Sequence, residues 1–466
     1  MRKFALKEID WPEFGTAIRP ETPPAEEFLR RIGNARLKME EKGLSHLVVY
    51  ADREHFANMA YLTGFDPRFE EALFILGLKG KPLLIVGNEC VGRLPVSPLY
   101  DAGEMDWLRY QPFSLLDQPK NDSLFLQDIL RNQGINEQSF VGCAGWKYFS
   151  ETEHPGSEYA VEIPSYIADS VRELAGRERV VNATSIFMEP DKGLRTFASP
   201  YEIAFFEYTN ILASEGVKNV LLHIEEGIQD YELAKYFGYA GEPLACHVSM
   251  RTGSTRHVSM SGPKGAFIRR GEPFSTGISY WGSNICRAGW VASSEDDLPQ
   301  KAKGYVENFA GPYFEAMSEW CSMLKPGVSG GEIAKMMEER LPYDRFRIFL
   351  NPGHLIHLDE WVSSPFYMGS KVRLHSGMVI QSDVIPSSPD YFSTRMEEGF
   401  VLAGQSLRKE LQKQFPGCYR RCVKRRNFMT DTLGFELPDE VLPLSNIPGI
   451  VSPFFLKPNT VFAIEK

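Results

Sequence analysis

Residues 372–403 read VRLHSGMVIQSDVIPSSPDYFSTRMEEGFVLA. Runs of apolar and β-branched residues predict strands within 372–385 and again within 394–403. The first segment contains Asp383, and the second contains Glu397 two residues after Arg395. Three further short segments with polar residues and glycines lie upstream of Asp383 and Glu397: Gly253–His257, Gly271–Gly277 leading to Cys286, and Asn351–His354.

The order of predicted elements indicates two domains. Ser199-Pro200-Tyr201-Glu202 predicts the start of a long helix, with a Ser cap, Pro at the first helical position and a carboxylate in the first turn. Upstream, 26–42 predicts an amphipathic helix, SHLVVYA a strand, and 72–88 a hairpin. A loop around Glu189–Gly193 therefore divides an N-terminal α/β domain (1–192) from a second domain (193–466). Residues from about 408 to 466 are predicted to form an ordered extension of it.

Size and composition agree with this division. A chain of 466 residues exceeds the ~250–300 residues that one core supports. A net charge of −10 disfavours nucleic acid and anionic membranes as partners. We expect the basic run Arg420–Arg426 to be a solvated helix face. No run approaches the ~18 apolar residues of a membrane helix, and the N-terminal residues lack the apolar stretch of a signal peptide. We therefore expect a cytoplasmic protein.

The seven cysteines are an odd number and are scattered, which favours reduced thiols over a disulfide framework. Cys418 and Cys422 form an i,i+4 pair without a second pair nearby, so a zinc site is not expected there.

The order, spacing and glycines of the four segments resemble the creatinase / aminopeptidase P / prolidase / methionine aminopeptidase family. The segment Asn58–Phe65 with Arg68 is similar to the creatinase-type N-terminal domain. The resemblance covers roughly residues 26–403. It implies an α/β (α+β) architecture, in which a creatinase-like N-terminal domain precedes a pita-bread catalytic domain, and it implies a homodimer.

In metal-dependent members of this family, two Asp, one His and two further carboxylates hold two divalent ions. By resemblance, the last three positions fall on His354, Asp383 and Glu397. The two Asp positions fall on Ser275 and Cys286, which supply no fixed negative charge. We therefore expect no dinuclear site and no cofactor. The alternative is one Mn, Co, Zn or Fe ion held by His354, Asp383 and Glu397.

The resemblance also suggests roles for other side chains. His257 is the candidate general acid/base, because the pKa of histidine lies near neutrality. Arg68 is the candidate clamp for a substrate carboxylate, with Phe65 beside it. His357 and Trp361 are candidates to line the substrate pocket.

Three functional hypotheses follow. The leading one is a creatinase-like, metal-independent hydrolase of a C–N bond in a small metabolite, in which His257, His354, Asp383 and Glu397 are catalytic. The first alternative is an Xaa-Pro metallopeptidase of the aminopeptidase P or prolidase type, with an altered single-metal site and a dipeptide substrate. The second alternative is a catalytically inactive binding homologue.

Overall fold

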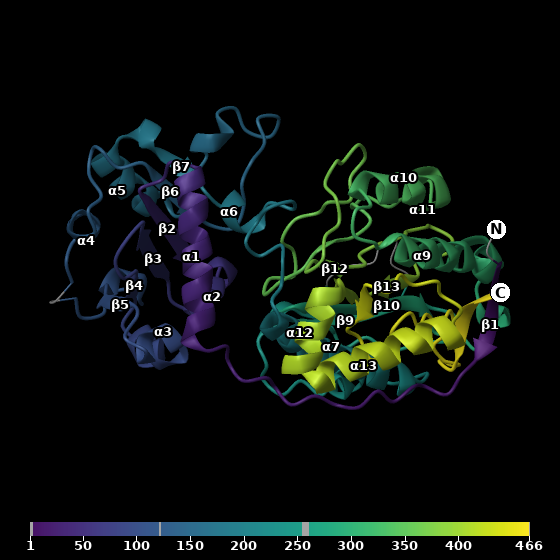
Figure 1. The fold of residues 1–466 in the computed structure, drawn as a ribbon. Coiled ribbons are helices and arrows are strands. Elements are labelled where there is room, and N and C mark those ends of the chain that lie inside the picture. Colours follow the sequence, from purple (N-terminus) through teal and green to yellow (C-terminus); the bar gives the residue numbers. More distant parts are fainter. Residues whose placement is uncertain (1–2, 121–122, 254–260, 466) are drawn as a thin grey trace. The chain divides into compact units, whose positions relative to one another are not determined.

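A computed structural model describes residues 3–120, 123–253 and 261–465 (Figure 1). The chain packs as two compact units, Glu21–Arg195 and Met1–Pro20 with Thr196–Lys466. The sequence predicts that residues 1–20 belong to the N-terminal domain. They belong instead to the C-terminal unit, because β1 (Lys3–Glu8) pairs antiparallel with β16 (Thr460–Glu465).

The unit Glu21–Arg195 is built on a sheet with the strand order β5-β4-β3-β2-β6-β7. Strand β2 pairs antiparallel with β3 and parallel with β6, and β3 and β4 form the predicted hairpin. The strands are β2 (His46–Ala51), β3 (Ala72–Gly77), β4 (Leu83–Val86), β5 (Asp106–Arg109), β6 (Val141–Ala144) and β7 (Val180–Asn182). The α-helices are α1 (Ala25–Glu41), α2 (Ala57–Thr63), α3 (Pro98–Asp101), α4 (Leu126–Asn132), α5 (Ser165–Ala175) and α6 (Ser185–Met188).

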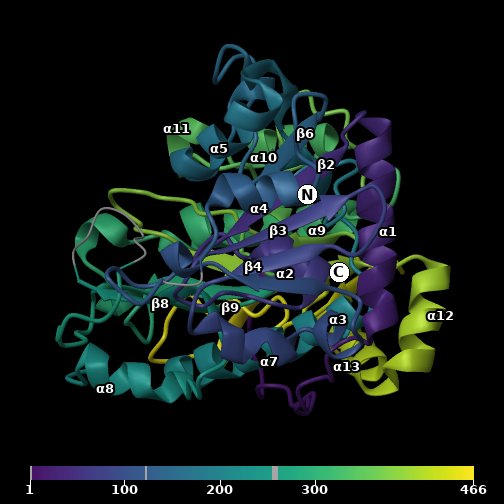
Figure 2. The same ribbon diagram turned by 90° about the vertical axis from the view of Figure 1, so that its left-hand side faces the viewer.

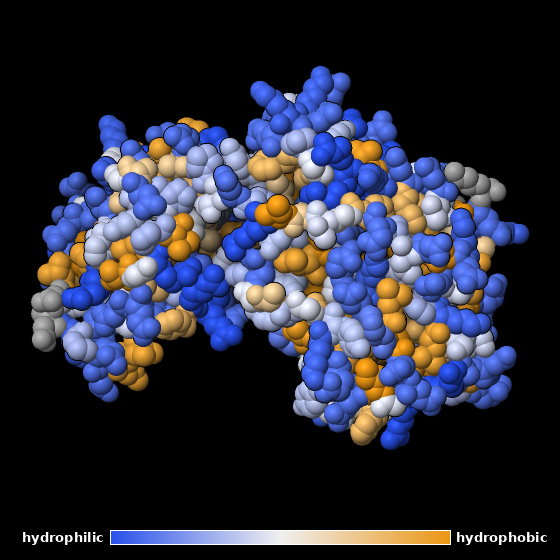
Figure 3. All heavy atoms as spheres, turned by 90° about the horizontal axis from the view of Figure 1, so that it is seen from below, coloured by the Kyte–Doolittle hydropathy of each residue, from blue (hydrophilic) through white to orange (hydrophobic). Residues whose placement is uncertain are grey.

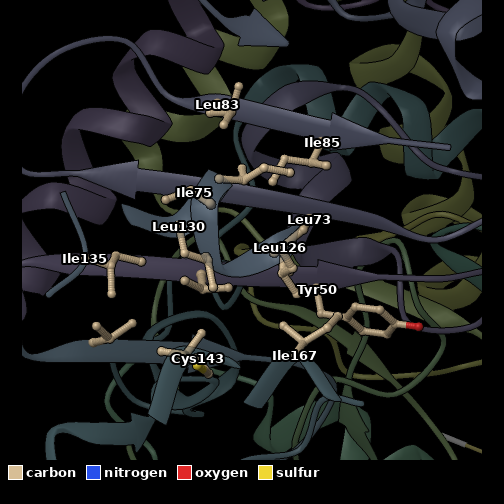
Figure 4. Close-up of a cluster of buried hydrophobic side chains, with 14 of the residues drawn as sticks. Tyr50, Leu73, Ile75, Leu83, Ile85, Leu126, Leu130, Ile135, Cys143 and Ile167 are labelled. Carbon is tan, nitrogen blue, oxygen red and sulfur yellow. The ribbon is translucent and has the colours of Figure 1, made fainter. Parts of the chain in front are cut away.

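One hydrophobic core of this unit lies between the sheet and helices α4 and α5. Alternate strand residues point into it, as the two-residue period of a strand requires (Figure 4). The main contributors are Val48, Tyr50, Leu73, Ile75, Leu83, Ile85, Leu126, Leu130, Cys143, Ile167 and Val171.

The C-terminal unit contains two further four-stranded sheets, ordered β13-β10-β9-β8 and β11-β12-β14-β15. The strands of the first are β8 (Leu244–Thr252), β9 (Pro273–Tyr280), β10 (Ser283–Trp290) and β13 (Arg395–Glu397). The strands of the second are β11 (His354–Leu355), β12 (Val379–Gln381), β14 (Gly399–Leu402) and β15 (Val441–Pro443). The neighbours in both sheets run antiparallel.

The long helix α7 (Pro200–Leu222) begins where the sequence predicts. The Ser199 hydroxyl accepts from the amide of Glu202, and the Glu202 carboxylate accepts from the amide of Ser199, which makes a capping box. The other α-helices are α8 (Asp230–Ala234), α9 (Gly311–Met323), α10 (Gly330–Arg340), α11 (Tyr343–Phe346), α12 (Gln405–Gln414) and α13 (Pro416–Asn427).

The predicted extension after residue 408 is integral to this unit. Helices α12 and α13 lie side by side in two views (Figures 1 and 2). Residues of both pack with α7 in one hydrophobic cluster that includes Phe206, Leu411 and Cys422. In the part of the chain that the structure describes, no helix has both the length and the apolar character of a membrane span. The face in Figure 3 is mostly hydrophilic, with smaller hydrophobic groups.

Candidate functional site

Strand register brings several candidate residues to one face of the sheet of β9, β10 and β13. Cys286 lies opposite both Gly277 and Glu397. Ala288, two residues further along β10, lies opposite both Ser275 and Arg395. Directly opposite residues of antiparallel strands share a face, as do residues two apart on one strand. Ser275, Cys286, Arg395 and Glu397 therefore share one face.

The neighbouring sheet supplies a histidine and a second carboxylate. His354 of β11 is paired with Gln381 of β12, and Asp383 follows two residues later. His354 is fully buried, and its Nδ1 lies 3.1 Å from the carbonyl oxygen of Leu355. Its Nε2 lies 3.2 Å from Glu360 Oε1 and 4.0 Å from Asp383 Oδ2. Because Nδ1 donates to a carbonyl, Nε2 is the nitrogen directed at the two carboxylates.

Arg395 joins the two carboxylates. Its Nη2 donates to Asp383 Oδ1 over 3.2 Å and also contacts Glu397 Oε2. The amide of Asn284 donates to Glu397 Oε1 over 2.7 Å and to Glu360 Oε1 over 3.2 Å. Asp383, Arg395, Glu397, Asn284, Glu360 and His354 therefore form one continuous polar cluster, here called the His354–Arg395 cluster.

The charges within this cluster are set by burial and by close partners. Burial by itself lowers the pKa of His354, but the Glu360 and Asp383 carboxylates raise it to about 9. Burial raises the pKa of Glu397 to about 8, against the lowering effect of Arg395. Burial also raises the pKa of the Cys286 thiol well above its ordinary value. His354 is thus cationic at neutral pH, and Cys286 is a neutral thiol.

Three members of the cluster, Glu360, Asn284 and Arg395, are absent from the sequence-based candidates. Glu360 matches no ligand position of the family pattern, and no spacing in the sequence marks it. Trp361, which was a candidate for the pocket, stacks on the His354 ring with centroids 4.2 Å apart and an angle of 27°. An indole face against an imidazolium is a favourable cation–π arrangement.

The other predicted site residues lie outside the His354–Arg395 cluster or outside the residues that the structure describes. His357 is 1% exposed, and its Nε2 lies 2.9 Å from Glu202 Oε1 at the start of α7. Phe65 is buried, and Arg68 has a φ of 59° and pairs with Asp66 over 3.0 Å; both belong to the unit Glu21–Arg195. Their roles at a substrate site stay predictions. His257 lies outside the described residues.

The donor set at this cluster does not fit the two divalent ions that the family resemblance implies. Ser275 and Cys286 carry no charge, and the remaining carboxylates Asp383 and Glu397 already contact the Arg395 guanidinium. A divalent ion 4 Å from that guanidinium would be repelled by roughly 8 kcal/mol at an effective dielectric constant of 20. The Asp383 and Glu397 oxygens that contact Arg395 would also have to leave the guanidinium before they could ligate an ion.

A different set of side chains has ligand-like spacing. Among the described residues, the donor atoms of Glu207, Cys418 and Cys422 lie within 4.8 Å of one another. Both Glu207 oxygens accept from guanidiniums, however: Arg421 at 2.8 and 2.6 Å and Arg425 at 2.7 Å. Arg425 is fully buried, so the prediction of a wholly solvated basic face at Arg420–Arg426 is wrong. These two ion pairs tie α13 to α7, and we assign them a structural role.

Comparison with known proteins supports the fold. No protein-family model and no curated protein matches the sequence. Among solved structures, the chain is similar to a prolidase from Thermococcus sibiricus, with a TM-score of 0.62 and 14% identity over 91% of this chain and 98% of that one. It is similar to an Xaa-Pro dipeptidase from Bacillus anthracis, with a TM-score of 0.61 and 13% identity over 81% and 96%. It is also similar to a putative aminopeptidase P from Bacillus anthracis, with a TM-score of 0.55 and 15% identity over 86% and 98%. The chain therefore has the pita-bread fold of the creatinase / aminopeptidase P / prolidase family.

Proposed function

We propose that this protein hydrolyses a C–N bond in a small amide or amidine substrate, without a resident metal ion. The observation that carries the proposal is the pair of the buried His354 and the partly exposed Glu360, which lies beside Asp383 and Glu397 in one polar cluster. Solvent reaches this pair at Glu360, whose side chain is 25% exposed.

Hydrolysis of a C–N bond needs a proton donor for the departing nitrogen. It also needs side chains that bind the substrate and orient its reacting carbon. His354, held as an imidazolium by Glu360, is suited to donate that proton. The carboxylates of Glu360 and Asp383 favour a substrate with N–H groups or positive charge. The exposed part of Trp361 offers an aromatic face to such a group. His257 remains the proposed acid/base partner that activates water.

The class of bond has support from the comparisons. The similar solved structures carry the names Xaa-Pro dipeptidase, prolidase and X-Pro aminopeptidase, and a peptide bond is a C–N bond. Fold alone does not determine chemistry, so the class of bond stays part of the proposal.

The same comparisons favour a second candidate, an Xaa-Pro dipeptidase with a single metal ion. His354, Asp383 and Glu397 are the residue types that could hold one ion, as a His plus two-carboxylate triad. In this candidate Arg395 would have to move away from both carboxylates before the ion could bind. We also propose a homodimer, from the resemblance stated above, and a cytoplasmic location, from the sequence pattern alone.

A substrate panel with matched metal analysis tests the proposal. Purified protein would be assayed on Xaa-Pro dipeptides and on guanidino, amidine and N-methyl amino acids, with and without chelator. We expect chelator-resistant turnover of a substrate in the second group, lost in His354→Asn. Turnover of Xaa-Pro dipeptides that a chelator abolishes and one added metal restores would refute the metal-free proposal. Binding without turnover across the panel would refute both enzymatic candidates and favour a binding homologue.

A further inference from the structure

Arg395 occupies the position between Asp383 and Glu397, two of the residues that could ligate a metal ion. Arg395 lies on β13, two residues before Glu397 and opposite Ala288. Its side chain is 11% exposed, while Asp383 is 7% and Glu397 is 0% exposed. A guanidinium thus lies between two buried carboxylates, one from each sheet.

The neighbours of Arg395 on the sheet are small or uncharged. Ala288 is directly opposite on β10, Ser275 is opposite Ala288 on β9, and Cys286 is a buried, neutral thiol. Carboxylates at 275 and 286 would add two negative charges to this face and require additional cations. Ser275 and Cys286 add none, so the acidic side chains that contact the Arg395 guanidinium are Asp383 and Glu397.

We infer that Arg395 is a built-in cation that replaces bound metal at this site, and that its removal would create a site for one divalent ion. This inference deepens the proposed function, since it names the group that makes the site metal-independent. It concerns the chain's own affinity for ions and does not require that the protein be an enzyme.

The vacated position would lie beside two carboxylates and one imidazole. The donor atoms of Asp383, Glu397 and His354 do not all lie within 4.8 Å of one another, so they would have to draw together around an ion. Without Arg395, the Asp383 and Glu397 oxygens that it contacts are freed, and His354 Nε2 lies 4.0 Å from Asp383 Oδ2. Two carboxylates and one imidazole are ligands that Mn²⁺ and Zn²⁺ accept. Removal of a buried positive charge would also end the repulsion of an incoming cation.

The test is the binding of Mn²⁺ to purified full-length protein, measured by isothermal titration calorimetry and by loss of the aqueous Mn²⁺ electron paramagnetic resonance signal. We expect Arg395→Ala to bind one equivalent of Mn²⁺ at least about tenfold more tightly than the wild type. Glu397→Gln in the same background should abolish the gain. Arg395→Lys keeps the positive charge and should bind no better than the wild type.

A matched control is Arg287→Ala. Arg287 is 2% exposed and donates to Glu398 over 3.0 Å, so its loss also removes a buried guanidinium but frees only one carboxylate. We expect no gain of Mn²⁺ affinity there. An unchanged affinity in folded Arg395→Ala would overturn the inference.

The wild type gives a second test that remains valid if Arg395→Ala fails to fold. We expect less than about a tenth of an equivalent of Mn²⁺ or Zn²⁺ after incubation and desalting. One tightly held equivalent that Glu397→Gln removes would overturn the inference. Failure of every substrate in the assay panel, by contrast, would refute only the proposed hydrolysis and leave the metal measurements unaffected.

Discussion

Replacing Glu360 by Gln tests whether the His354–Glu360 pair carries charge in the folded protein. The change keeps the size of the side chain and removes the carboxylate 3.2 Å from His354 Nε2. The imidazolium would keep Asp383, 4.0 Å away, as its remaining near carboxylate. We expect loss of stability at neutral pH and a fall in the pKa of His354.

The expected magnitude follows from that pKa. Although burial lowers it, the nearby carboxylates raise it from 6.5 to about 9. At about 1.36 kcal/mol per pKa unit, the raised pKa corresponds to a stabilisation of roughly 3 kcal/mol. Glu360 is the nearer of the two carboxylates, so we expect Glu360→Gln to lose about 1–3 kcal/mol.

The pH dependence has a definite sign. Because the folded state binds this proton more tightly than the unfolded state, the stabilisation is fully present below about pH 6.5 and is lost as the pH rises through 9. In Glu360→Gln, one of the two carboxylates that raise the pKa of His354 is lost, so burial lowers this pKa towards 6.5. The difference in stability between wild type and variant should therefore be largest near pH 6 and small near pH 10.

Urea unfolding at several pH values measures this difference, and a double-mutant cycle with His354→Asn isolates the pair from the rest of the cluster. Glu339→Gln is a suitable control, because that side chain is 66% exposed on α10 and its loss should change stability by less than about 0.5 kcal/mol. A coupling energy below about 0.3 kcal/mol between residues 354 and 360 would refute a charged pair. So would a difference that grows as the pH rises.

Three further predictions concern the rest of the molecule. Gly277→Ala should destabilise by about 1–3 kcal/mol in urea unfolding, because the added methyl group would collide with Cys286 Sγ. The Asp52 carboxylate raises the pKa of His55, so the protonated ring contributes a small stabilisation that is lost as the pH rises above about 6.5. Thermal melts should show this loss in the wild type and not in His55→Asn. Glu207→Gln should cost about 3–5 kcal/mol, since it removes the carboxylate that pairs with two guanidiniums of α13 and leaves the buried Arg425 only neutral side-chain oxygen acceptors such as Asn446 Oδ1; a loss below about 1 kcal/mol would contradict that role.

Local signals in the sequence predicted many of the elements. The cap at Ser199 and the hairpin of β3 and β4 depend on neighbouring residues, and both occur in the structure. The pairing of β1 with β16 joins residues at opposite ends of the chain, as in Lys3 with Glu465. No local periodicity carries that information, so residues 1–20 were assigned to the wrong domain.

The candidate site was predictable to a similar degree. The family resemblance selected His354, Asp383 and Glu397, which do lie close together. It did not select Glu360, because a residue that holds no family ligand position has no pattern to match. Arg395 lies in the segment 372–403 but had no predicted role, since its role depends on a contact with Asp383, which follows a strand of the other sheet. Such a contact is a property of the folded chain.

Charge balance connects the lost ligands to the side chains that remain. In the metal-dependent pattern described above, four carboxylates offset two divalent ions. Here, Glu360 and Asp383 offset the positive charges of His354 and Arg395, and Glu397, with its pKa raised to about 8, is mostly neutral at pH 7. The cluster is thus close to neutral without any ion. An added divalent ion would bring two positive charges into this buried cluster. To restore the balance, both Glu397 and His354 would have to lose a proton. Metal binding by the wild type should therefore be weak, and it should strengthen as the pH rises.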